Sequence, residues 1–446
     1  MSGIAKIMMN LGYEVSGSDL KASEALNRLK SSGAKVYIGH KASNVYGADL
    51  VVMSSAIPAT NPEYIMAKES NIPIVHRADM LSLLMAPKKG IAVTGAHGKT
   101  TTTSMISLIL EKNDFDPTVV IGGELNDIGG NASLGHGDYL VAEADESDGS
   151  FLKLNPFIAV VTNIENDHLD HYKNMDAMKE AFKKFIGNIK EGGFAVLGSD
   201  NENVREIIKE VNKEHYTFGL NYPADYMVKN IRAYGMESSF DVYFREKFLG
   251  RVELHVPGMH NIYNATAAVA VGDRLGINFD GMVRALKMFR GVQRRFQIVG
   301  DVEGVKIIDD YAHHPTEIKA TLKAAKLCNP RKIYAIFQPH RYTRTRILAE
   351  EFGGAFENAD EVILTRIYSA GEAPIPGVTS ELIYNALMRN GKQVTYIEEM
   401  EAIPDYILPK LKPGDYVLTI GAGDIWNVAC NIATGLQKTF LKGGNR

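Results

Sequence analysis

The sequence predicts an α/β protein built mainly on parallel sheets. Apolar strand patterns alternate with helical patterns along nearly the whole chain, which is typical of parallel strands joined by helices. The chain has 446 residues, and this length suggests about three domains at roughly 150 residues each. Hydrophobic residues make up 45% and charged residues 23% of the chain, as in ordinary globular proteins.

The composition argues against several other classes of protein. There are 49 Lys and Arg against 53 Asp and Glu residues, so the net charge is −4. This charge disfavours a broadly basic nucleic-acid-binding protein and gives no reason to expect membrane binding. The two cysteines, Cys328 and Cys430, are too few for a disulfide scaffold and fit a reducing cytoplasm. No stretch approaches the ~20 apolar residues of a membrane span, and the N-terminus does not resemble a secretory signal.

Residues 1–86 are expected to form a first α/β section. The helical patterns are AKIMMNLG, ALNRLKSSG and NPEYIMAKES, and the strand patterns are YEVSGSD, AKVYIGH, DLVVMSSAI and IPIVHR. Gly12 follows the first helical pattern, where glycine commonly ends a helix. The section opens on a helix, whereas nucleotide-binding α/β units normally open on a strand and a Gly-rich loop.

Two further α/β sections are expected, residues 87–297 and 298–446. In the middle section the strand patterns are KKGIAVTG, HGDYLVAEAD, FIAVVTNI, GFAVLGSD, YTFGL, FDVYFRE and GRVELHV, and the helical patterns are GKTTTTSMISLILEKN, AMKEAFKKFIGNI and NIYNATAAVAVGDRL. In the last section the strand patterns are VKIIDDYA, RKIYAIFQPH, EVILTRIY, QVTYI and YVLTIGAGDIWN, and the helical patterns are PTEIKATLKAAK, ILAEEFGGAFEN and TSELIYNALMRNG.

The strongest motif is GAHGKTTTTS, which follows an apolar strand and opens a helix. Gly95 and Gly98 allow backbone amides to approach phosphate oxygens at a helix N-terminus. Lys99 can reach the β- and γ-phosphates, and the Thr100 hydroxyl can bind Mg²⁺. Val93 stands where the usual phosphate-loop spacing has its first glycine. The alternative is a Gly-rich turn that only caps a helix, but four consecutive threonines, which are middling helix formers, argue against it.

Acidic residues crowd the end of the strand in VAEADESDGSF: Glu143, Asp145, Glu146 and Asp148. Their mutual repulsion calls for a counter-charge, which a hard cation supplies. A solvated acidic turn is the alternative. The position favours a ligand site, because ligands of open α/β sheets sit beyond the carboxyl ends of the strands.

A third strand end carries TNIENDHLDHY, in which His168 lies among Asp167, Asp170 and His171. A histidine beside carboxylates can complete a divalent-metal site or orient a substrate group. A structural or solvated histidine is the alternative, but convergence of three polar strand ends favours the functional interpretation.

Further candidates follow in the second half of the chain. Asn261 and Asn264 are three residues apart on one helical face, where their amides can pair with a base edge or simply cap the helix. Arg294 and Arg295 form a candidate anion clamp or interdomain contact.

Two polar stretches lie in the last section. DDYAHHPTE places Asp309, Asp310, His313 and His314 at a strand end, where a carboxylate could hold a ribose. FQPHRYTRTR is expected to form a positive loop carrying His340, Arg341, Arg344 and Arg346. Such a loop suits recognition of carboxylate or phosphate groups, and a solvated basic loop is the alternative.

These motifs, in this order, resemble the Mur ligase family of three-domain, ATP-dependent, amide-forming enzymes. The matching blocks are SGSD, GAHGKTTTTS, AEADESDGSF, TNIENDHLDHY, HNIYNATAAVAV, RRFQ, DDYAHHPTE, FQPHRYTRTR, YSAGEAPIPG and GAGDIWN. The resemblance implies a Rossmann-like N-terminal domain for the UDP-sugar (1–86), a central P-loop ATPase domain (87–297) and a Rossmann-like C-terminal domain (298–446). The last would bind the amino acid and close on ATP.

The ESD and YSAGE blocks resemble most the members of the family that add L-alanine. They imply an ADP-forming ligase that joins L-alanine to the lactyl carboxylate of UDP-N-acetylmuramate through an acyl phosphate, in peptidoglycan precursor synthesis. ATP and Mg²⁺ would be its cofactors. It would be a cytoplasmic monomer or weak homodimer with small-molecule substrates and no membrane or nucleic-acid partner. A tripeptide-recycling ligase and a P-loop NTPase without ligase activity are the alternatives.

The resemblance also implies roles for individual residues. The implied ATP-binding residues are Gly95, Ala96, His97, Gly98, Lys99, Thr100, Thr101, Asn261, Asn264, Arg294 and Asp310. The implied metal ligands are Thr100, Glu143 and His168. The implied substrate-binding residues are Asp19, His40, Ser55, Arg295, His313, His314, His340, Arg341 and Arg344. The implied catalytic residues are Lys99, His168, Arg341 and Arg344.

The chain departs from the family at its start, because relatives carry a strand and a G-x-G-G-x-G loop just before the segment MSGIAK. That loop normally holds the diphosphate of the sugar nucleotide through backbone amides. We therefore expect weak sugar-nucleotide binding, a first sheet that lacks a strand, and a tendency to aggregate. Adding an upstream strand and Gly-rich loop is expected to raise solubility and activity.

Overall fold

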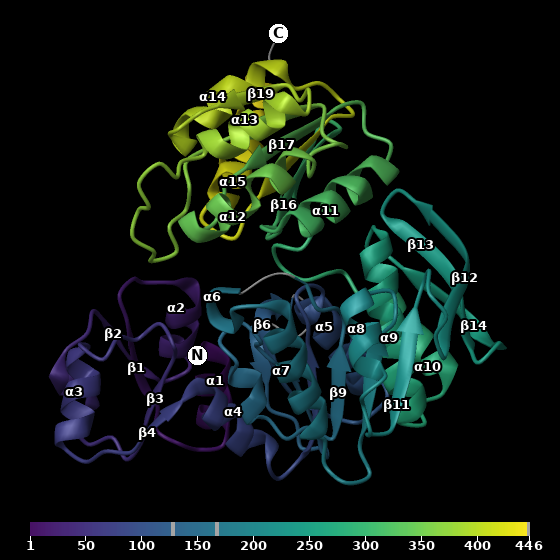
Figure 1. Ribbon diagram of the computed structural model, residues 1–446. Coiled ribbons are helices and arrows are strands. Elements are labelled where there is room, and N and C mark those ends of the chain that lie inside the picture. The colour runs from purple at the N-terminus through teal and green to yellow at the C-terminus, as the bar shows by residue number, and fades with distance from the viewer. Residues whose placement is uncertain (126–129, 166–168, 444–446) are drawn as a thin grey trace. The chain divides into compact units, whose positions relative to one another are not determined.

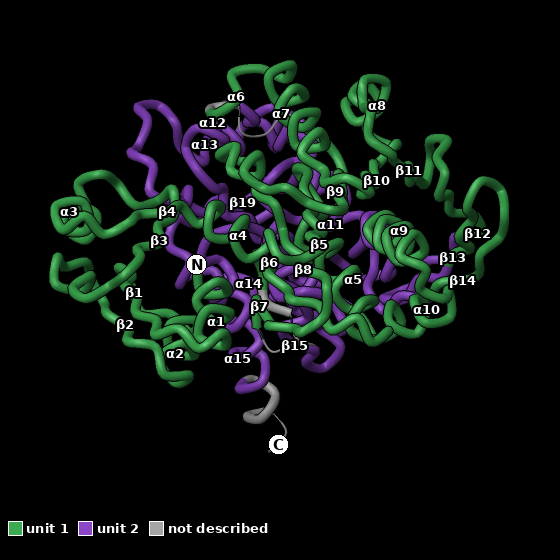
Figure 2. The backbone as a smooth tube through the Cα atoms, turned by 90° about the horizontal axis from the view of Figure 1, so that it is seen from below, with its two compact units in different colours: residues 1–230, 240–252, 263–289 green, residues 231–239, 253–262, 290–446 purple. Residues whose placement is uncertain are grey.

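The computed structural model describes residues 1–125, 130–165 and 169–443 (Figure 1). These residues fall into two compact units, which Figure 2 shows in different colours. Unit 1 comprises residues 1–230, 240–252 and 263–289, and unit 2 comprises residues 231–239, 253–262 and 290–446. Parallel sheets connected by helices make up most of both units, which confirms the expected α/β class. No helix in these described residues is long and apolar enough to cross a membrane.

The N-terminal section of unit 1 contains two separate two-stranded parallel sheets. The strands are β1 (Ser16–Asp19), β2 (Lys35–Ile38), β3 (Val51–Met53) and β4 (Ile74–His76), and the helices are α1 (Ser2–Asn10), α2 (Glu24–Ser31), α3 (Pro62–Glu69) and α4 (Arg77–Met85), with a 3₁₀ turn over Ala42–Val45. The sheets pair β1 with β2 and β3 with β4. The sequence prediction was right for seven of these elements and missed two, the 3₁₀ turn and α4, which follows β4 with no intervening turn residue.

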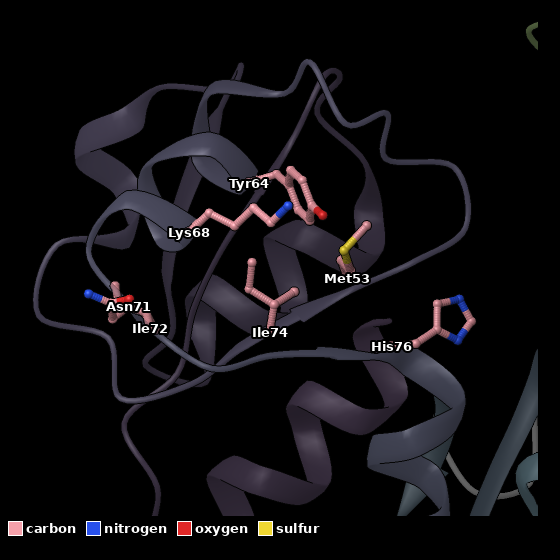
Figure 3. Close-up of a pocket in the computed structure, with 7 residues that line it drawn as sticks. All are labelled: Met53, Tyr64, Lys68, Asn71, Ile72, Ile74 and His76. Atoms are coloured by element: carbon pink, nitrogen blue, oxygen red, sulfur yellow. The ribbon is translucent and has the colours of Figure 1, made fainter.

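An open hollow lies between α3 and the strands β3 and β4 (Figure 3). Its lining residues are Met53, Tyr64, Lys68, Asn71, Ile72, Ile74 and His76. Apolar side chains of both strands thus remain incompletely covered by the helix that crosses them.

A ten-stranded sheet with the order β14-β13-β12-β11-β10-β9-β5-β8-β6-β7 forms the centre of the next section. The strands are β5 (Lys89–Thr94), β6 (Thr118–Leu125), β7 (Gly130–Ser133), β8 (Tyr139–Glu143), β9 (Ile158–Val161), β10 (Phe194–Gly198), β11 (His215–Gly219), β12 (Tyr226–Tyr234), β13 (Glu237–Phe244) and β14 (Lys247–Leu254). The pairs from β11 to β6 are parallel, and β7 is antiparallel to β6. The carboxyl ends of β8, β5 and β9 therefore lie side by side at one edge.

The helices of this section are α5 (Lys99–Glu111), α6 (Leu169–Tyr172), α7 (Met175–Gly187), α8 (Glu202–Ile208), α9 (Met259–Arg274) and α10 (Phe279–Met288), with a 3₁₀ turn over Ser150–Lys153. Helix α7 buries one apolar face, including Phe182 and Phe185, against Phe151. Sequence patterns did not indicate β6, β7, β12, α8 or α10, which are short or mixed in polarity.

Unit 2 contains a six-stranded sheet with the order β15-β16-β20-β17-β18-β19. Its strands are β15 (Gln297–Val302), β16 (Val305–Asp310), β17 (Ile333–Phe337), β18 (Glu361–Leu364), β19 (Val394–Tyr396) and β20 (Tyr416–Ile420). Only the β15–β16 pair is antiparallel. The helices are α11 (Pro315–Leu327), α12 (Tyr342–Gly353), α13 (Glu381–Arg389), α14 (Ile403–Ile407) and α15 (Trp426–Gly443), with 3₁₀ turns over Met400–Ala402 and Leu408–Lys410.

Two expectations for unit 2 need correction. The stretch YTRTR was expected in a positive loop, but α12 begins at Tyr342 and carries Arg344 and Arg346. Glu372 accepts hydrogen bonds from the amide and hydroxyl of Thr343, which stabilises the first turn of α12. The helix α15 was not expected beyond the Gly turn, although its buried face packs on β15, β16 and β20.

Candidate functional site

The loop between β5 and α5 is shaped to approach an anion closely. Gly95 has φ +134°, and Gly98 has φ +81° as the N-cap of α5. A Cβ on Gly95 would lie 2.2 Å from Thr162 Oγ1, and one on Gly98 would lie 2.5 Å from Asn264 Oδ1. Both positions therefore require glycine, for conformation and for space.

The N-terminal turn of α5 offers unpaired backbone donors. Among the described residues, the amides of Gly98, Lys99 and Thr100 have no hydrogen-bond acceptor. The helix N-terminus adds partial positive charge at the same place. This arrangement can bind phosphate oxygens, as the motif suggested.

Lys99 extends across this loop. Its Nζ lies 2.6 Å from the carbonyl of Gly95, 3.4 Å from that of Ala96 and 2.7 Å from Glu146 Oε1. Burial disfavours the charged amine, but Glu146, Glu143 and Asp145 outweigh this effect and raise the pKa of Lys99. The lysine is thus held as a cation at the phosphate loop.

Glu146 also belongs to this site, although the sequence assigned it no role. Its side chain is 2% exposed, and its Oε2 accepts a hydrogen bond from Thr94 Oγ1 at 3.2 Å. The hydroxyl of Tyr172 donates to the Glu146 carbonyl. The sequence signals were its place in the acidic stretch after β8 and in the ESD block, neither of which assigned a role to its side chain.

Thr100 and Glu143 meet at the same sheet edge. Thr100 Oγ1 donates to Glu143 Oε2 at 3.0 Å, and the amide of Gly122 donates to the same oxygen at 3.1 Å. A hydroxyl and a carboxylate oxygen beside a phosphate loop are the ligand types that Mg²⁺ prefers. The structure therefore brings together two of the three residues expected to bind metal.

His168, the third residue expected to bind metal, lies outside the described residues, as does Asp167. The side chain of Asp170 is also not described. His171 is described and is exposed on α6, where its ring packs edge-on against Tyr172 with centroids 4.7 Å apart.

The acidic loop after β8 also contacts the N-terminal section. Ser55 Oγ donates to Asp148 Oδ2 at 2.5 Å and lies 3.3 Å from His76 Nε2. Arg77 pairs with Asp145 at 3.3 Å. Burial raises the pKa of Asp148, but hydrogen bonds, including that from Ser55, lower it overall. Ser55 is thus the expected substrate residue that lies beside the acidic loop.

The other two residues expected near the UDP-sugar lie elsewhere in this section. Ser18 Oγ lies 3.0 Å from His40 Nδ1 and donates to Glu63 at 2.6 Å. Asp19 accepts the Lys21 amide at 3.3 Å. Among the described residues, no hydrogen bond connects these groups with Ser55.

The candidate Asn pair lies on α9. Asn264 Oδ1 faces Gly98, next to the phosphate loop. Asn261 Nδ2 donates to the carbonyl of Pro257 at 2.7 Å, one turn earlier in the chain.

In unit 2, Arg294 is fully engaged in local contacts. Its Nε donates to Asp309 at 2.9 Å, and its terminal nitrogens donate to the carbonyls of Gly423 and Gly421 at 3.0 and 2.8 Å. Asp310 accepts the amides of Phe296 and Ala312, each at 2.8 Å, and burial raises its pKa to about 6.

His260 is a half-buried histidine that the sequence did not single out, and it lies near the charge of Arg295. Burial and the charge of Arg295 lower the pKa of His260 to about 4, so it is neutral at physiological pH. Arg295 itself pairs with Glu317 at 3.4 Å.

Rings and cations cluster at the carboxyl ends of β16 and β17. His340 stacks on Tyr368 with centroids 5.7 Å apart and meets His313 edge-on at 5.5 Å. Arg344 lies 3.2 Å from His340 Nδ1. Arg341 has φ +70° at the start of α12, and its buried Nε has no hydrogen-bond partner among the described residues.

His314, in the same region, forms hydrogen bonds at the N-terminus of α11. Its Nδ1 accepts the Thr316 amide at 3.4 Å, and Glu317 accepts the His314 amide at 3.3 Å. His314 therefore caps α11.

Comparison with known proteins places these motifs in one family. The chain matches the Mur ligase middle domain over residues 93–272, the Mur ligase glutamate ligase domain over residues 294–423, and the Mur ligase family catalytic domain over residues 1–89.

Individual relatives match nearly the whole chain. UDP-N-acetylmuramate–L-alanine ligase of Pelotomaculum thermopropionicum is 53% identical, with 98% of this chain and 95% of that protein covered. The enzyme of the same name from Dictyoglomus turgidum is 54% identical, with coverages of 96% and 93%. The crystal structure of UDP-N-acetylmuramate–alanine ligase from Thermotoga maritima is 32% identical with a TM-score of 0.85, covering 98% of this chain and 97% of that one.

Proposed function

This chain belongs to the Mur ligase family, and on that premise we propose that it is an ATP-dependent, ADP-forming ligase. Its reaction joins L-alanine to the lactyl carboxylate of UDP-N-acetylmuramate, a step of peptidoglycan precursor synthesis in the cytoplasm. The observation that carries this proposal is the match to relatives named for this activity, at 53 and 54% identity over 98 and 96% of the chain.

The nucleotide is proposed to bind at the loop between β5 and α5. The amides of Gly98, Lys99 and Thr100, which have no acceptor among the described residues, would hold phosphate oxygens, and the Lys99 amine would neutralise their charge. Ala96, His97 and Thr101 belong to the same loop and helix start, and Asn264 lies against Gly98. Reaching the β- and γ-phosphates requires Lys99 to exchange its contacts with Glu146 and the loop carbonyls for contacts with ATP.

The oxygen atoms of Thr100 and Glu143, 3.0 Å apart, fit a hard divalent cation. Mg²⁺ bound there would neutralise charge on the transferring phosphoryl group. His168 is proposed as a further ligand on the family resemblance alone.

The proposed reaction has two steps, formation of an acyl phosphate and its attack by an amine. A carboxylate oxygen of the lactyl group attacks the γ-phosphorus, and ADP leaves. The neutral amine of L-alanine then attacks the acyl phosphate carbon, the amide bond forms, phosphate leaves and the amine loses a proton. The acyl phosphate must be kept from water, because hydrolysis would waste it.

Substrate roles for the remaining residues follow from the family. We propose that the UDP-sugar is bound by Asp19, His40 and Ser55 and that Arg295, His313, His314, His340, Arg341 and Arg344 place the acyl group and L-alanine. Asn261, Arg294 and Asp310 are proposed around the nucleoside. The corresponding domains are residues 1–86, 87–297 and 298–446.

The test is phosphate release by the chain with ATP and Mg²⁺, UDP-N-acetylmuramate, and either L-alanine or no amine. The expected result is release that requires both the sugar nucleotide and L-alanine, together with an amide product seen by mass spectrometry. Release that is indifferent to both substrates would contradict the proposal and indicate a plain NTPase. Replacing L-alanine by the tripeptide tests the recycling alternative.

A further inference from the structure

Asn163 makes an unusual set of contacts with the phosphate loop. Its Oδ1 accepts the His97 amide at 2.8 Å, and its Nδ2 donates to the His97 carbonyl at 3.0 Å. The backbone carbonyl of Asn163 accepts the Ala96 amide at 3.2 Å. Asn163, which follows β9, thus forms hydrogen bonds with three backbone groups of the loop after β5: the Ala96 amide, the His97 amide and the His97 carbonyl.

These contacts divide the amides of the loop into two sets. The amides of Ala96 and His97 are bound by Asn163, whereas those of Gly98, Lys99 and Thr100 have no acceptor in the described parts of the chain. Since an anion can only use donors that are not already engaged, Asn163 determines which amides a phosphate group meets.

We propose that Asn163 is a positioning residue for nucleotide binding, which fixes the loop 95–98 in its phosphate-binding conformation. The proposal rests on the proposed function, because it assumes that the loop binds ATP. Asn163 acts through His97, and nothing in the proposal requires it to touch the nucleotide.

The chemistry of the contact selects asparagine. An Asp at this position could accept the His97 amide but could not donate to the His97 carbonyl, and it would add negative charge beside the phosphates. Thr162 supports the same carbonyl, because its Oγ1 donates to His97 at 2.6 Å. The two side chains therefore clamp His97 from the end of a neighbouring, parallel strand.

The chain offers a matched control for a merely structural role. Asn203 on α8 donates through Nδ2 to the carbonyl of Ile164 at 2.8 Å. It holds the segment after β9 through Ile164, and this hydrogen bond does not involve the phosphate loop. Asn203→Ala therefore removes an equivalent amide hydrogen bond while leaving His97 clamped.

The experiment measures Mg-ADP binding to the full chain by calorimetry, and steady-state KM values in the ligase assay. We expect Asn163→Ala to weaken ADP binding and raise the KM for ATP about tenfold, as the loss of two coupled hydrogen bonds implies. Asn163→Asp should bind ADP more weakly than Asn163→Ala does. The KM values for UDP-N-acetylmuramate and L-alanine should stay unchanged, and Asn203→Ala should bind ADP like the unmodified chain.

Several outcomes would overturn the proposal. Unchanged ADP affinity in Asn163→Ala would exclude a positioning role, and so would an equal loss of affinity in Asn203→Ala. If Asn163→Ala fails to fold, Thr162→Val replaces it, with Thr162→Ser as the conservative variant that should restore ADP affinity. Absence of ADP binding by the unmodified chain would instead refute the proposed function, on which the inference depends.

Discussion

The N-terminal section and the central sheet of unit 1 follow the same strand–helix alternation but are stabilised differently. Every residue of β9 and β10 is buried, whereas no residue of β1 or β2 is buried. The central strands are paired on both sides, but β1 to β4 form only two-stranded sheets. Two-stranded sheets are marginal without further packing.

Helices connect the N-terminal section to the main core. Ile4 of α1 and Met80, Leu81 and Met85 of α4 belong to the same buried cluster as Phe151. The strands between them carry exposed apolar residues such as Ile38, and the hollow beside α3 leaves Ile74 incompletely covered. Alternating strand and helix patterns thus specify where the strands and helices form in both sections. The number of strands paired in each sheet determines how stable each section is.

The largest expected effect is the loss of a central aromatic residue. Phe151 is fully buried and packs on Phe182 and Phe185 with centroids 5.2 and 5.0 Å apart. Phe151→Ala should lower the free energy of unfolding by ~3–5 kcal/mol, measured by urea denaturation. Ile38→Ala, at an exposed position in β2, should change it by less than ~0.5 kcal/mol. Equal effects would refute the comparison.

Breaking the ion pair between Lys99 and Glu146 in the central section should likewise cost more unfolding free energy than breaking an exposed pair in the N-terminal section. Lys99→Met leaves the carboxylate of Glu146 buried without its cation and should cost ~3 kcal/mol of unfolding free energy. The double variant Lys99→Met with Glu146→Gln should recover at least half of this loss, because no unpaired charge remains. Both variants should lack ligase activity.

The matched control is the exposed pair of Arg28 and Glu24 in α2. Arg28→Ala should change the free energy of unfolding by no more than ~0.5 kcal/mol. A double variant no more stable than Lys99→Met would show that the Lys99–Glu146 pair is not what stabilises this part of the loop.

Hydrogen exchange should resolve the two sections directly. Amides in β1 and β2 are expected to exchange at least ~100-fold faster than those in β9 and β10, because two-stranded sheets open without unfolding the core. The measurement is native-state exchange read by mass spectrometry on peptides from residues 14–40 and 155–200. Similar protection in both sets would mean that the N-terminal strands unfold only with the whole unit.

The sequence predicted most strands and helices that have strong apolar patterns or glycine ends. It missed α4 and α15, which follow strand or turn segments without a clear start signal, and β6 and β12, whose apolar patterns are weak. Their formation depends on neighbours in the sheet, which local sequence does not specify.

The candidate site was predictable where chemistry follows from a local motif. The contact between Thr100 and Glu143 agrees with the metal ligands that the family resemblance implied, and it forms because β5 and β8 are neighbouring parallel strands. Glu146 could not be told apart from Glu143, because which acidic side chain turns inward depends on the fold. Asn163 lies in the TNIENDHLDHY motif but was given no role, since its contacts are with the backbone of a loop distant in the sequence.

The smallest expected effect concerns the polar contacts that hold the N-terminal section together. Glu63 of α3 accepts hydrogen bonds from Ser18 of β1 and Asn44 of the 3₁₀ turn, each at 2.6 Å. Burial raises the pKa of Glu63, but these bonds, with the Lys41 amide and the nearby His40, lower it below its usual value of 4.5. A carboxyl with a lowered pKa stabilises the fold above pH 4.5 and loses that contribution as the pH falls through the folded-state pKa.

Glu63→Gln should therefore destabilise the N-terminal strands by about 1 kcal/mol at pH 7, read as faster exchange of the β1 and β2 amides. The difference from the unmodified chain should shrink when both are measured below the usual carboxyl pKa, because protonated Glu63 has also lost its charge. Glu24→Gln, at an exposed position on α2, should show no such pH-dependent difference. A Glu63→Gln effect that is constant with pH would mean that the shape of the side chain, and not its charge, holds β1, the 3₁₀ turn and α3 together.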